Sequence, residues 1–187
     1  MNRFSSKHTF QRERPVKGVV PLVLLIALVI DSALPSIFPN AFLGNDQVII
    51  SHLLLYFIST FAFYLRHSYI LLYAFLFGLL ADSYNTTLLG IYAVLYFIIA
   101  YLITSLRRHF PRNAIIHMML FIVAMTIVDF VVYFFFLKLG FTKIDFQQYV
   151  LIRLGPTLIY NTALTFFMYF PNRALLSWLG YDDHIIF

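Results

Sequence analysis

Four side chains of fixed charge interrupt long apolar stretches of this 187-residue chain: Asp31, Asp82, Asp129 and Arg153. Such a group at the centre of a membrane helix costs roughly 2.5–3.5 kcal/mol on insertion scales, so it normally faces a partner or water. Carboxylates in that setting brace helices, line a solvated cavity or relay protons. These four residues are therefore the first candidates for a functional site.

The last apolar run carries a second polar feature. Arg153, Thr157, Asn161 and Thr165 recur at every fourth residue, which places them on one face of a helix. Pro156 lies inside this stripe and removes one backbone donor, which loosens the helix nearby. We favour a helix–helix seam joined by hydrogen bonds, worth about 0.6 kcal/mol each on average, over a face that lines a substrate path.

Small residues mark two neighbouring runs as a close-packed pair. Ala74, Gly78 and Asp82 are spaced four apart, and Gly90 and Ala93 open the next run. Small side chains let two helix backbones approach closely. The short connection between the runs then predicts an antiparallel helical hairpin.

The residue types needed for most catalytic chemistry are missing from the sequence. There is no cysteine, no Gly-rich phosphate loop, no Ser nucleophile elbow and no HExxH motif. His52 and His117 stand alone on apolar runs without a second ligand at metal-binding spacing, so we interpret both as packed or hydrogen-bonded residues. We therefore expect no catalytic residues, no metal and no cofactor, and the chain is not predicted to be an enzyme.

The elements that must position these residues are membrane helices. Hydrophobic residues make up 61% of the chain and charged residues only 11%, against about 25% charged in a soluble domain. We predict an all-α, polytopic membrane protein: a six-helix transmembrane bundle occupying residues 16–178, between a basic cytoplasmic tail (1–15) and a second cytoplasmic tail (179–187). The predicted helices are 16–38, 47–65, 69–82 (with a possible extension to Thr87), 88–106, 114–137 and 149–170.

The distribution of basic residues predicts that both termini are cytoplasmic. With six helices and the N-terminus inside, ten Lys and Arg residues fall on the cytoplasmic side and two, Lys138 and Lys143, on the outer side. Because the basic residues are spread between apolar runs, the net charge of +5 does not indicate nucleic-acid binding.

In this topology all four intramembrane charges fall in the outer half of the membrane. One arginine cannot neutralise three carboxylates, so either some carboxyl groups are protonated or they reach water or a partner protein. We favour internal bracing, with Arg153 bridging Asp82 or Asp129, and we specifically predict a pairing of Asp82 with Arg153. A solvated outer vestibule is the main alternative, and a proton pathway is weaker because no second layer of carboxylates continues inward.

Two stretches resemble the MreD family of rod shape-determining membrane proteins. Phe77-Gly78-Leu79-Leu80-Ala81-Asp82, followed after seven residues by Gly90-Ile91-Tyr92-Ala93, resembles the family's G-x-x-x-D pair and the glycine that opens its next helix. Pro156-Thr157-Leu158-Ile159-Tyr160-Asn161 resembles the proline and asparagine of the family's last helix. Length, helix count and the basic N-terminus agree over nearly the whole chain.

The resemblance implies a non-enzymatic scaffold of the bacterial cell-elongation (peptidoglycan synthesis) machinery, multi-pass in the cell membrane. It implies an MreC-like protein, a RodA-type polymerase and a class B penicillin-binding protein as partners. It also implies an architecture similar to the substrate-binding subunits (S-components) of vitamin transporters. The alternative function is therefore a substrate-binding subunit of a small-molecule uptake transporter, which the outer polar residues would suit.

Overall fold

The computed structural model describes residues 5–44, 47–65, 69–85 and 89–180. Within these ranges the regular structure is helical and no β-strand is formed, which confirms the all-α prediction. The helices, in chain order, are α1 (Ser5–Ile37), α2 (Pro39–Phe42), α3 (Leu53–Tyr64), α4 (Ile70–Asn85), α5 (Ile91–Leu106), α6 (Ala114–Lys138), α7 (Phe146–Tyr149), the π-helix η1 (Val150–Leu154) and α8 (Gly155–Trp178).

Three stretches are long and apolar enough to cross a membrane by themselves. They are Val16–Ile37 within α1, Ala114–Lys138 (α6) and Phe146–Trp178, in which α7, η1 and α8 form one rod. Three shorter apolar helices, α3, α4 and α5, lie among them. Each predicted range overlaps one of these helices, but the count of six membrane crossings stays a prediction.

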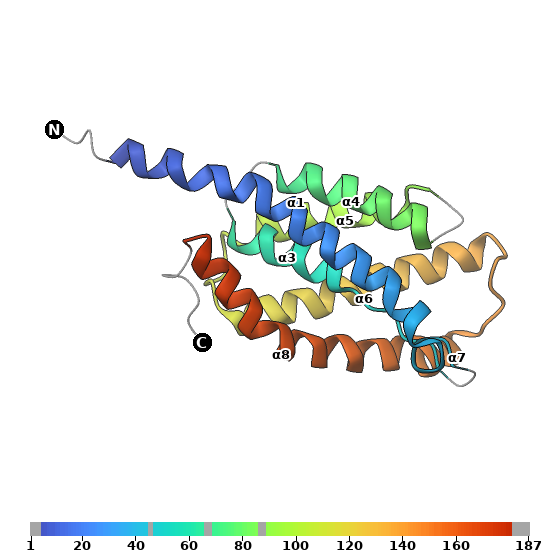
Figure 1. Cartoon of the computed structure of the whole chain (residues 1–187). Helices are drawn as coiled ribbons and strands as arrows, with labels where there is room; N and C mark the ends of the chain where they lie inside the picture. Colours follow the sequence, from blue (N-terminus) through green and yellow to red (C-terminus); the bar gives the residue numbers. More distant parts are fainter. Residues whose placement is uncertain (1–4, 45–46, 66–68, 86–88, 181–187) are drawn as a thin grey trace.

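The long helices and the short ones run back and forth along one direction (Figure 1). The beginning of α1 and the end of α8 lie at one end of the bundle, at the left of the view. At the opposite end, at the right of the view, α1 and α6 end and α7 begins, while α3 begins nearer the middle of the bundle. This second end carries the polar residues described below, and we call it the capped end.

The second predicted helix is shorter than expected. The apolar run 47–65 was predicted to be helical throughout, but α3 begins only at Leu53, and residues 47–52 form irregular backbone. Twelve helical residues are about 18 Å long, well short of a hydrocarbon core of about 30 Å. α3 alone is therefore too short to cross such a core, and the non-helical segment 47–52 precedes it in the chain.

Two other predicted boundaries also change. α1 begins at Ser5, so the backbone of residues 5–15, expected to be a separate tail, is continuous with the first apolar helix. The last helix, predicted for 149–170, continues to Trp178 through Pro171. The possible extension of the third helix to Thr87, and most of the predicted C-terminal tail, lie outside the described residues.

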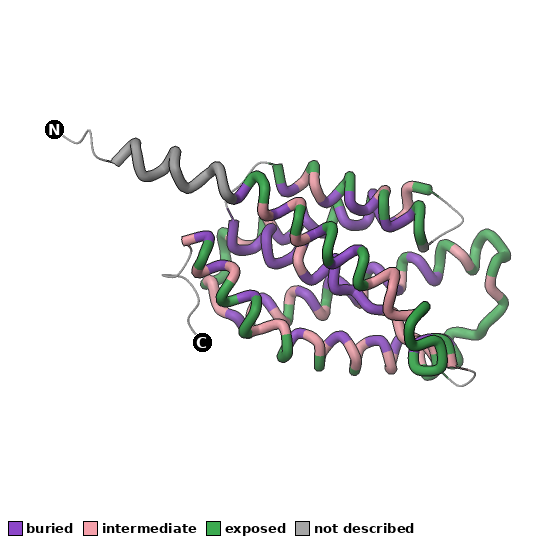
Figure 2. Tube along the Cα trace, viewed as in Figure 1, coloured by how far each residue is buried: buried purple, intermediate pink, exposed green. Residues whose placement is uncertain are grey.

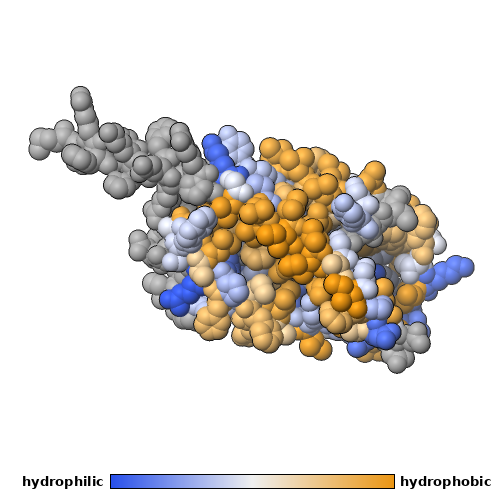
Figure 3. Space-filling view, viewed as in Figure 1, coloured by the Kyte–Doolittle hydropathy of each residue, from blue (hydrophilic) through white to orange (hydrophobic). Residues whose placement is uncertain are grey.

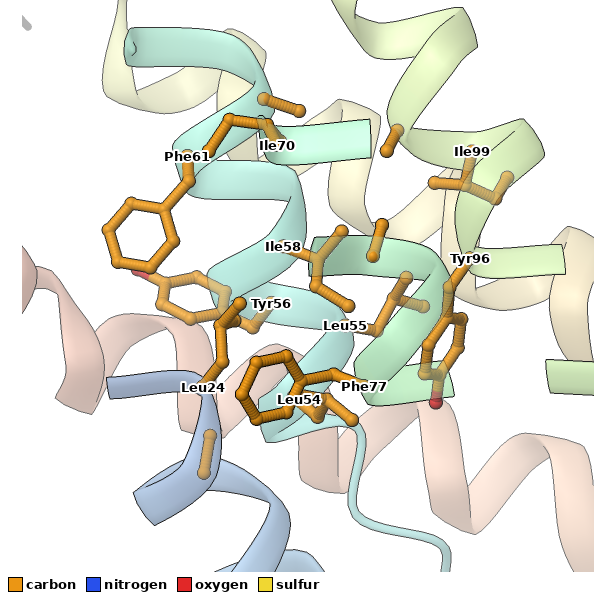
Figure 4. Packing of buried hydrophobic residues seen from close by; sticks show 14 of the residues in the cluster. Leu24, Leu54, Leu55, Tyr56, Ile58, Phe61, Ile70, Phe77, Tyr96 and Ile99 are labelled. Atoms are coloured by element: carbon orange, nitrogen blue, oxygen red, sulfur yellow. The ribbon is translucent and has the colours of Figure 1, made fainter. Parts of the chain in front are cut away.

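The α3 helix is the centre of the bundle. Eleven of its twelve residues are buried, and Phe57 is the exception (Figure 2). It packs against α1, α4, α5, α6 and α8. Its side chains meet those of α1, α4 and α5 in a continuous apolar core, where Leu24, Leu54, Leu55, Tyr56, Ile58, Phe61, Phe77 and Tyr96 lie together (Figure 4).

The outside of the bundle is also apolar. Large hydrophobic side chains are exposed on α1, α4, α5, α6 and α8, among them Leu22, Leu72, Val123, Ile159 and Phe167. On the face shown in Figure 3, apolar residues form a broad band over the middle of the molecule. A surface of this composition suits hydrocarbon as the surrounding solvent, because water would leave it strongly disfavoured.

Candidate functional site

Asp31 of α1 caps the beginning of α3. Its carboxylate accepts hydrogen bonds from the amides of Leu53 (3.0 Å) and Leu54 (2.8 Å) and from the hydroxyl of Ser51 (2.5 Å). The first amides of a helix have no partner within the helix and carry a partial positive charge. The negative charge of Asp31 is therefore balanced by a helix end and by hydrogen bonds, without an arginine.

Asp82 of α4 performs the same task for α5. Its carboxylate accepts from the amides of Gly90 (3.0 Å), Tyr92 (3.0 Å) and Ala93 (3.1 Å), and the residue is fully buried. Gly90 has a φ of 107°, a left-handed conformation that glycine adopts at little cost. The conformation of Gly90 thus turns the chain so that three amides face one carboxylate.

The close-packed pair predicted from the small residues is present. A Cβ atom on Gly78 would lie 2.5 Å from the Cα atom of Ala93, so only glycine fits at this crossing of α4 and α5. Ala74 is completely buried on the same face. Small residues therefore bring α4 close enough for Asp82 to reach the amides of α5.

Asp129 of α6 faces a histidine. One carboxylate oxygen lies 3.2 Å from Nε2 of His52, and both side chains are buried. The Tyr149 hydroxyl donates to the backbone carbonyl of Asp129 (2.9 Å), which joins α7 to α6. The second Asp129 oxygen has no hydrogen-bond partner among the described residues. His52, predicted to be a packed or hydrogen-bonded residue, is hydrogen-bonded, and its partner is a carboxylate of the apolar helix α6.

The polar stripe on α8 holds the irregular segment 47–52. Thr157 accepts from the amide of Ile50 (3.1 Å), and the Asn161 side chain accepts from the amide of His52 (2.9 Å) and donates to the Ile50 carbonyl (2.7 Å). Non-helical backbone is tolerated at membrane depth only where protein satisfies its polar groups. The stripe was predicted to form a seam with another helix. Its hydrogen bonds show that it also pairs with the non-helical backbone of segment 47–52.

Pro156 contributes to the same arrangement through the donor it lacks. In a regular α-helix the carbonyl of Ile152 would accept from the amide of residue 156, and proline has none. That carbonyl instead accepts from the amide of Val48 (2.8 Å). The preceding residues form the π-helix η1, in which Gly155 donates to the carbonyl of Val150. The carbonyl that Pro156 leaves without a donor in its own helix therefore accepts a hydrogen bond from the non-helical segment 47–52.

Arg153 is not part of these networks. The predicted pairing with Asp82 is not formed: Asp82 binds the amides of α5, and within the described part of the chain the Arg153 side chain makes no hydrogen bond or ion pair. Its buried Nε atom is without a hydrogen-bond partner. Arg153 lines two cavities, of about 280 and 390 Å³.

A second polar group lies on the other half of α3. The hydroxyls of Ser59 and Thr60 donate to the carbonyl of Tyr56 and both lie 3.2 Å from Nε2 of His117. With both hydroxyl protons donated to that carbonyl, the tautomer of His117 that carries a hydrogen on Nε2 suits this arrangement. His117 is therefore a hydrogen-bonded packing residue that joins α6 to α3.

Sequence reasoning found the carboxylates but missed most of their partners. Ser51, Tyr149 and the backbone amides were not predicted, because a helix end becomes a partner only when tertiary structure brings a carboxylate to it. Arg107, taken as one of several loop cations, contacts the end of α3: its guanidinium donates to the carbonyl of Ala62 (3.0 Å) and to that of Leu65. For Arg107 and Asp31 no local motif indicates the contact. Asp82, in contrast, belongs to the small-residue pattern that predicts the close pairing of α4 with α5.

Comparisons with known proteins point to one family. The model of the family described as rod shape-determining protein MreD matches residues 13–179. The chain is 23% identical over 155 residues to the rod shape-determining protein MreD of Bacillus subtilis (strain 168), covering 83% of this chain and 90% of that protein. No solved structure matches the chain. With the family match running from the first apolar helix to the end of the last, this chain belongs to the MreD family of rod shape-determining proteins.

Proposed function

We propose that the protein is a non-enzymatic membrane scaffold of the machinery that builds the cell wall during elongation. It would act in the bacterial cell membrane with an MreC-like protein, a RodA-type polymerase and a class B penicillin-binding protein. The observation that carries the proposal is how the buried polar groups are used. Asp31, Asp82, Thr157 and Asn161 all hold helix ends or backbone in place.

The lateral surfaces support the same proposal. A scaffold needs apolar faces on which other membrane segments can pack. α8 offers such a face opposite its polar stripe, where Ile159, Phe166, Phe167 and Phe170 are exposed. Aromatic side chains provide large rigid contact areas, which suits a partner helix as well as lipid.

The test is depletion combined with copurification. Depleting the protein is expected to make rod-shaped cells rounder or wider, and a tagged copy purified from native membranes is expected to retain an MreC-like protein. A matched copy with Phe166, Phe167 and Phe170 changed to leucine keeps the surface apolar while removing the aromatic contacts. Normal cell shape after clean deletion without suppressors would reject the proposal.

The topology of the proposal has its own experiment. Six crossings with both termini in the cytoplasm would place the capped end toward the outside. Reporter fusions after Trp178 and within residues 139–145 are expected to report opposite compartments. A shared compartment for these two positions would reject the six-crossing arrangement.

The two cavities beside Arg153 favour one second candidate, a substrate-binding subunit of a small-molecule uptake transporter. Their volumes, about 280 and 390 Å³, are in the range of small ligand pockets. This candidate requires a vitamin-like ligand that remains bound through purification and whose uptake is lost on deletion. Loss of cell shape with unchanged uptake would favour the scaffold.

A further inference from the structure

Arg153 lines two cavities at the capped end. One, of about 280 Å³, lies among α1, α3 and α5, and the other, of about 390 Å³, lies between α6 and the beginning of the last helical rod. Both are lined by Val48, Tyr92 and Arg153. A ligand in either cavity would therefore lie beside Arg153.

The guanidinium group of Arg153 has no anionic partner among the described residues. Its Nε atom is buried without a hydrogen bond, and none of the described carboxylates forms an ion pair with it. Asp31 and Asp82 are occupied by helix ends, and Asp129 contacts His52. The Arg153 side chain is half-buried, so an anion beside it would accept charge-assisted hydrogen bonds from the guanidinium in a setting partly shielded from water.

The linings of the two cavities are both mainly apolar, but they differ in their charged groups. The first has the Asp31 carboxylate, Ser51 and His52 in its wall, among residues such as Leu28 and Leu54. The second has Val132, Phe136 and Ile144 in its wall, with Arg153 as its charged residue. A hydrocarbon chain therefore suits the second cavity. A phosphate is expected at Arg153 on the side away from Asp31, because a planar guanidinium can bind it through two parallel hydrogen bonds.

We propose that the capped end holds a phosphate-bearing lipid, whose phosphate binds Arg153 and one of whose acyl chains enters the second cavity. This site does not depend on which cell-wall partners the protein has. A lipid is favoured over a soluble anion because the second, mainly apolar cavity is the larger of the two and borders Arg153 directly. The competing arrangement is internal: the unpartnered second oxygen of Asp129 would turn to Arg153 and close the ion pair within the protein.

The test measures lipid binding to the full chain, purified and stripped of lipid in a neutral detergent. Native mass spectrometry follows titration with phosphatidylglycerol, and a neutral diacylglycerol and inorganic phosphate serve as comparisons. We expect saturable binding of phosphatidylglycerol, at least about tenfold tighter than of the diacylglycerol, and no binding of inorganic phosphate at the same concentrations. Equal binding of the two lipids, or binding of inorganic phosphate alone, would overturn the proposal.

Variants locate the site. Arg153→Gln is expected to weaken phosphatidylglycerol binding about tenfold or more, and Arg153→Lys to weaken it less, because lysine keeps the charge but loses the fork. Lys138→Gln, which removes an exposed cation at the same end of the bundle, is the matched control and is expected to bind as the parent does. Equal losses in Lys138→Gln and Arg153→Gln would indicate general surface charge and reject the site.

Two further variants are needed. One keeps the test valid if Arg153→Gln does not fold, and the other tests whether Asp129 pairs with Arg153 within the protein. Val132→Phe fills the second cavity while all charges stay in place, and it is expected to reduce lipid binding even if Arg153→Gln fails to fold. Asp129→Asn is expected to leave binding unchanged if Arg153 already binds the phosphate. A marked gain of binding in Asp129→Asn would show that Asp129 holds Arg153 in the parent protein, and would overturn the proposal.

Discussion

Asp31 and Arg107 lie at opposite ends of α3, and each provides the charge that the end it contacts requires. Asp31 accepts from the first amides of the helix, and Arg107 donates to carbonyls at its last turn. Negative charge at the beginning of a helix and positive charge at its end both favour the helix macrodipole. The buried central helix is thus held at both ends by side chains from its neighbours.

Removing Arg107 should destabilise the protein, whereas removing its neighbour should not. Arg107→Ala leaves carbonyls at the end of α3 without their charged donor, and such hydrogen bonds contribute about 1.5–3 kcal/mol. Arg108→Ala is the matched control, because Arg108 is exposed. Thermal unfolding in detergent, followed by circular dichroism, compares the two variants. Equal midpoints would show that the contact with α3 contributes nothing.

Removing the carboxylate of Asp31 should cost more than neutralising it. Asp31→Ala leaves two amides and a hydroxyl without an acceptor, and each unsatisfied buried group costs about 1–3 kcal/mol. Asp31→Asn keeps one oxygen as an acceptor and is expected to be the milder change. Unfolding midpoints of the two purified variants provide the comparison. The reverse order would reject Asp31 as the cap of α3.

Adding a single methyl group to Gly78 should separate α4 from α5. The new Cβ would lie 2.5 Å from the Cα atom of Ala93, so backbone must move, and overpacking of this kind costs about 1–3 kcal/mol. Gly18→Ala is the control, because a Cβ there meets nothing within 4 Å and alanine favours the helix. Loss of stability in Gly78→Ala, with none in Gly18→Ala, is the expected result of thermal unfolding.

Double-mutant cycles should show coupling between His52 and Asp129, which are in contact, and none between Asp82 and Arg153, which were predicted to pair. His52→Ala and Asp129→Ala are expected to couple by about 0.5–3 kcal/mol, because the two side chains are in contact. Asp82→Ala and Arg153→Ala are expected to add within about 0.3–0.5 kcal/mol. Free energies of unfolding for each cycle give the answer. Strong coupling between Asp82 and Arg153 would restore the predicted pairing.

Replacing Pro156 should release Val48. In Pro156→Ala the new amide competes for the carbonyl of Ile152, which now accepts from Val48. Hydrogen exchange at the Val48 amide is therefore expected to accelerate. Pro171→Ala, which changes the other proline of α8, is the control and should leave exchange at Val48 unchanged. Unchanged exchange in both variants would show that the proline does not maintain this contact.

The extent to which the sequence predicts this structure differs between elements. The long apolar helices α1 and α6 begin or end close to the predicted residues, because composition alone separates them from their flanks. Segment 47–52 was predicted to be helical because its residues continue an apolar run. The break there depends on Thr157, Asn161 and Asp31, which lie far away along the chain, and hydropathy does not register such partners.

The candidate site shows the same division. The four intramembrane charges were identifiable because charge stands out in an apolar run. The partners of these charges were not identifiable. From the charges alone, Arg153 was predicted to pair with a carboxylate, whereas in the structure Asp31 and Asp82 bind backbone amides and Asp129 contacts a histidine. Electrical balance in this bundle is provided mainly by helix ends, and these become partners only in the folded chain.

The contacts of segment 47–52 have a consequence for the order in which the chain is assembled. Ile50 and His52 find their acceptors and donors on residues that follow them by more than a hundred positions. A ribosome synthesises those residues last, so the second segment enters the bilayer with its peptide groups still unmatched. Until the last helix is in place, water or other proteins would have to satisfy these peptide groups, and a chain truncated before Thr157 would lack the side chains of both Thr157 and Asn161.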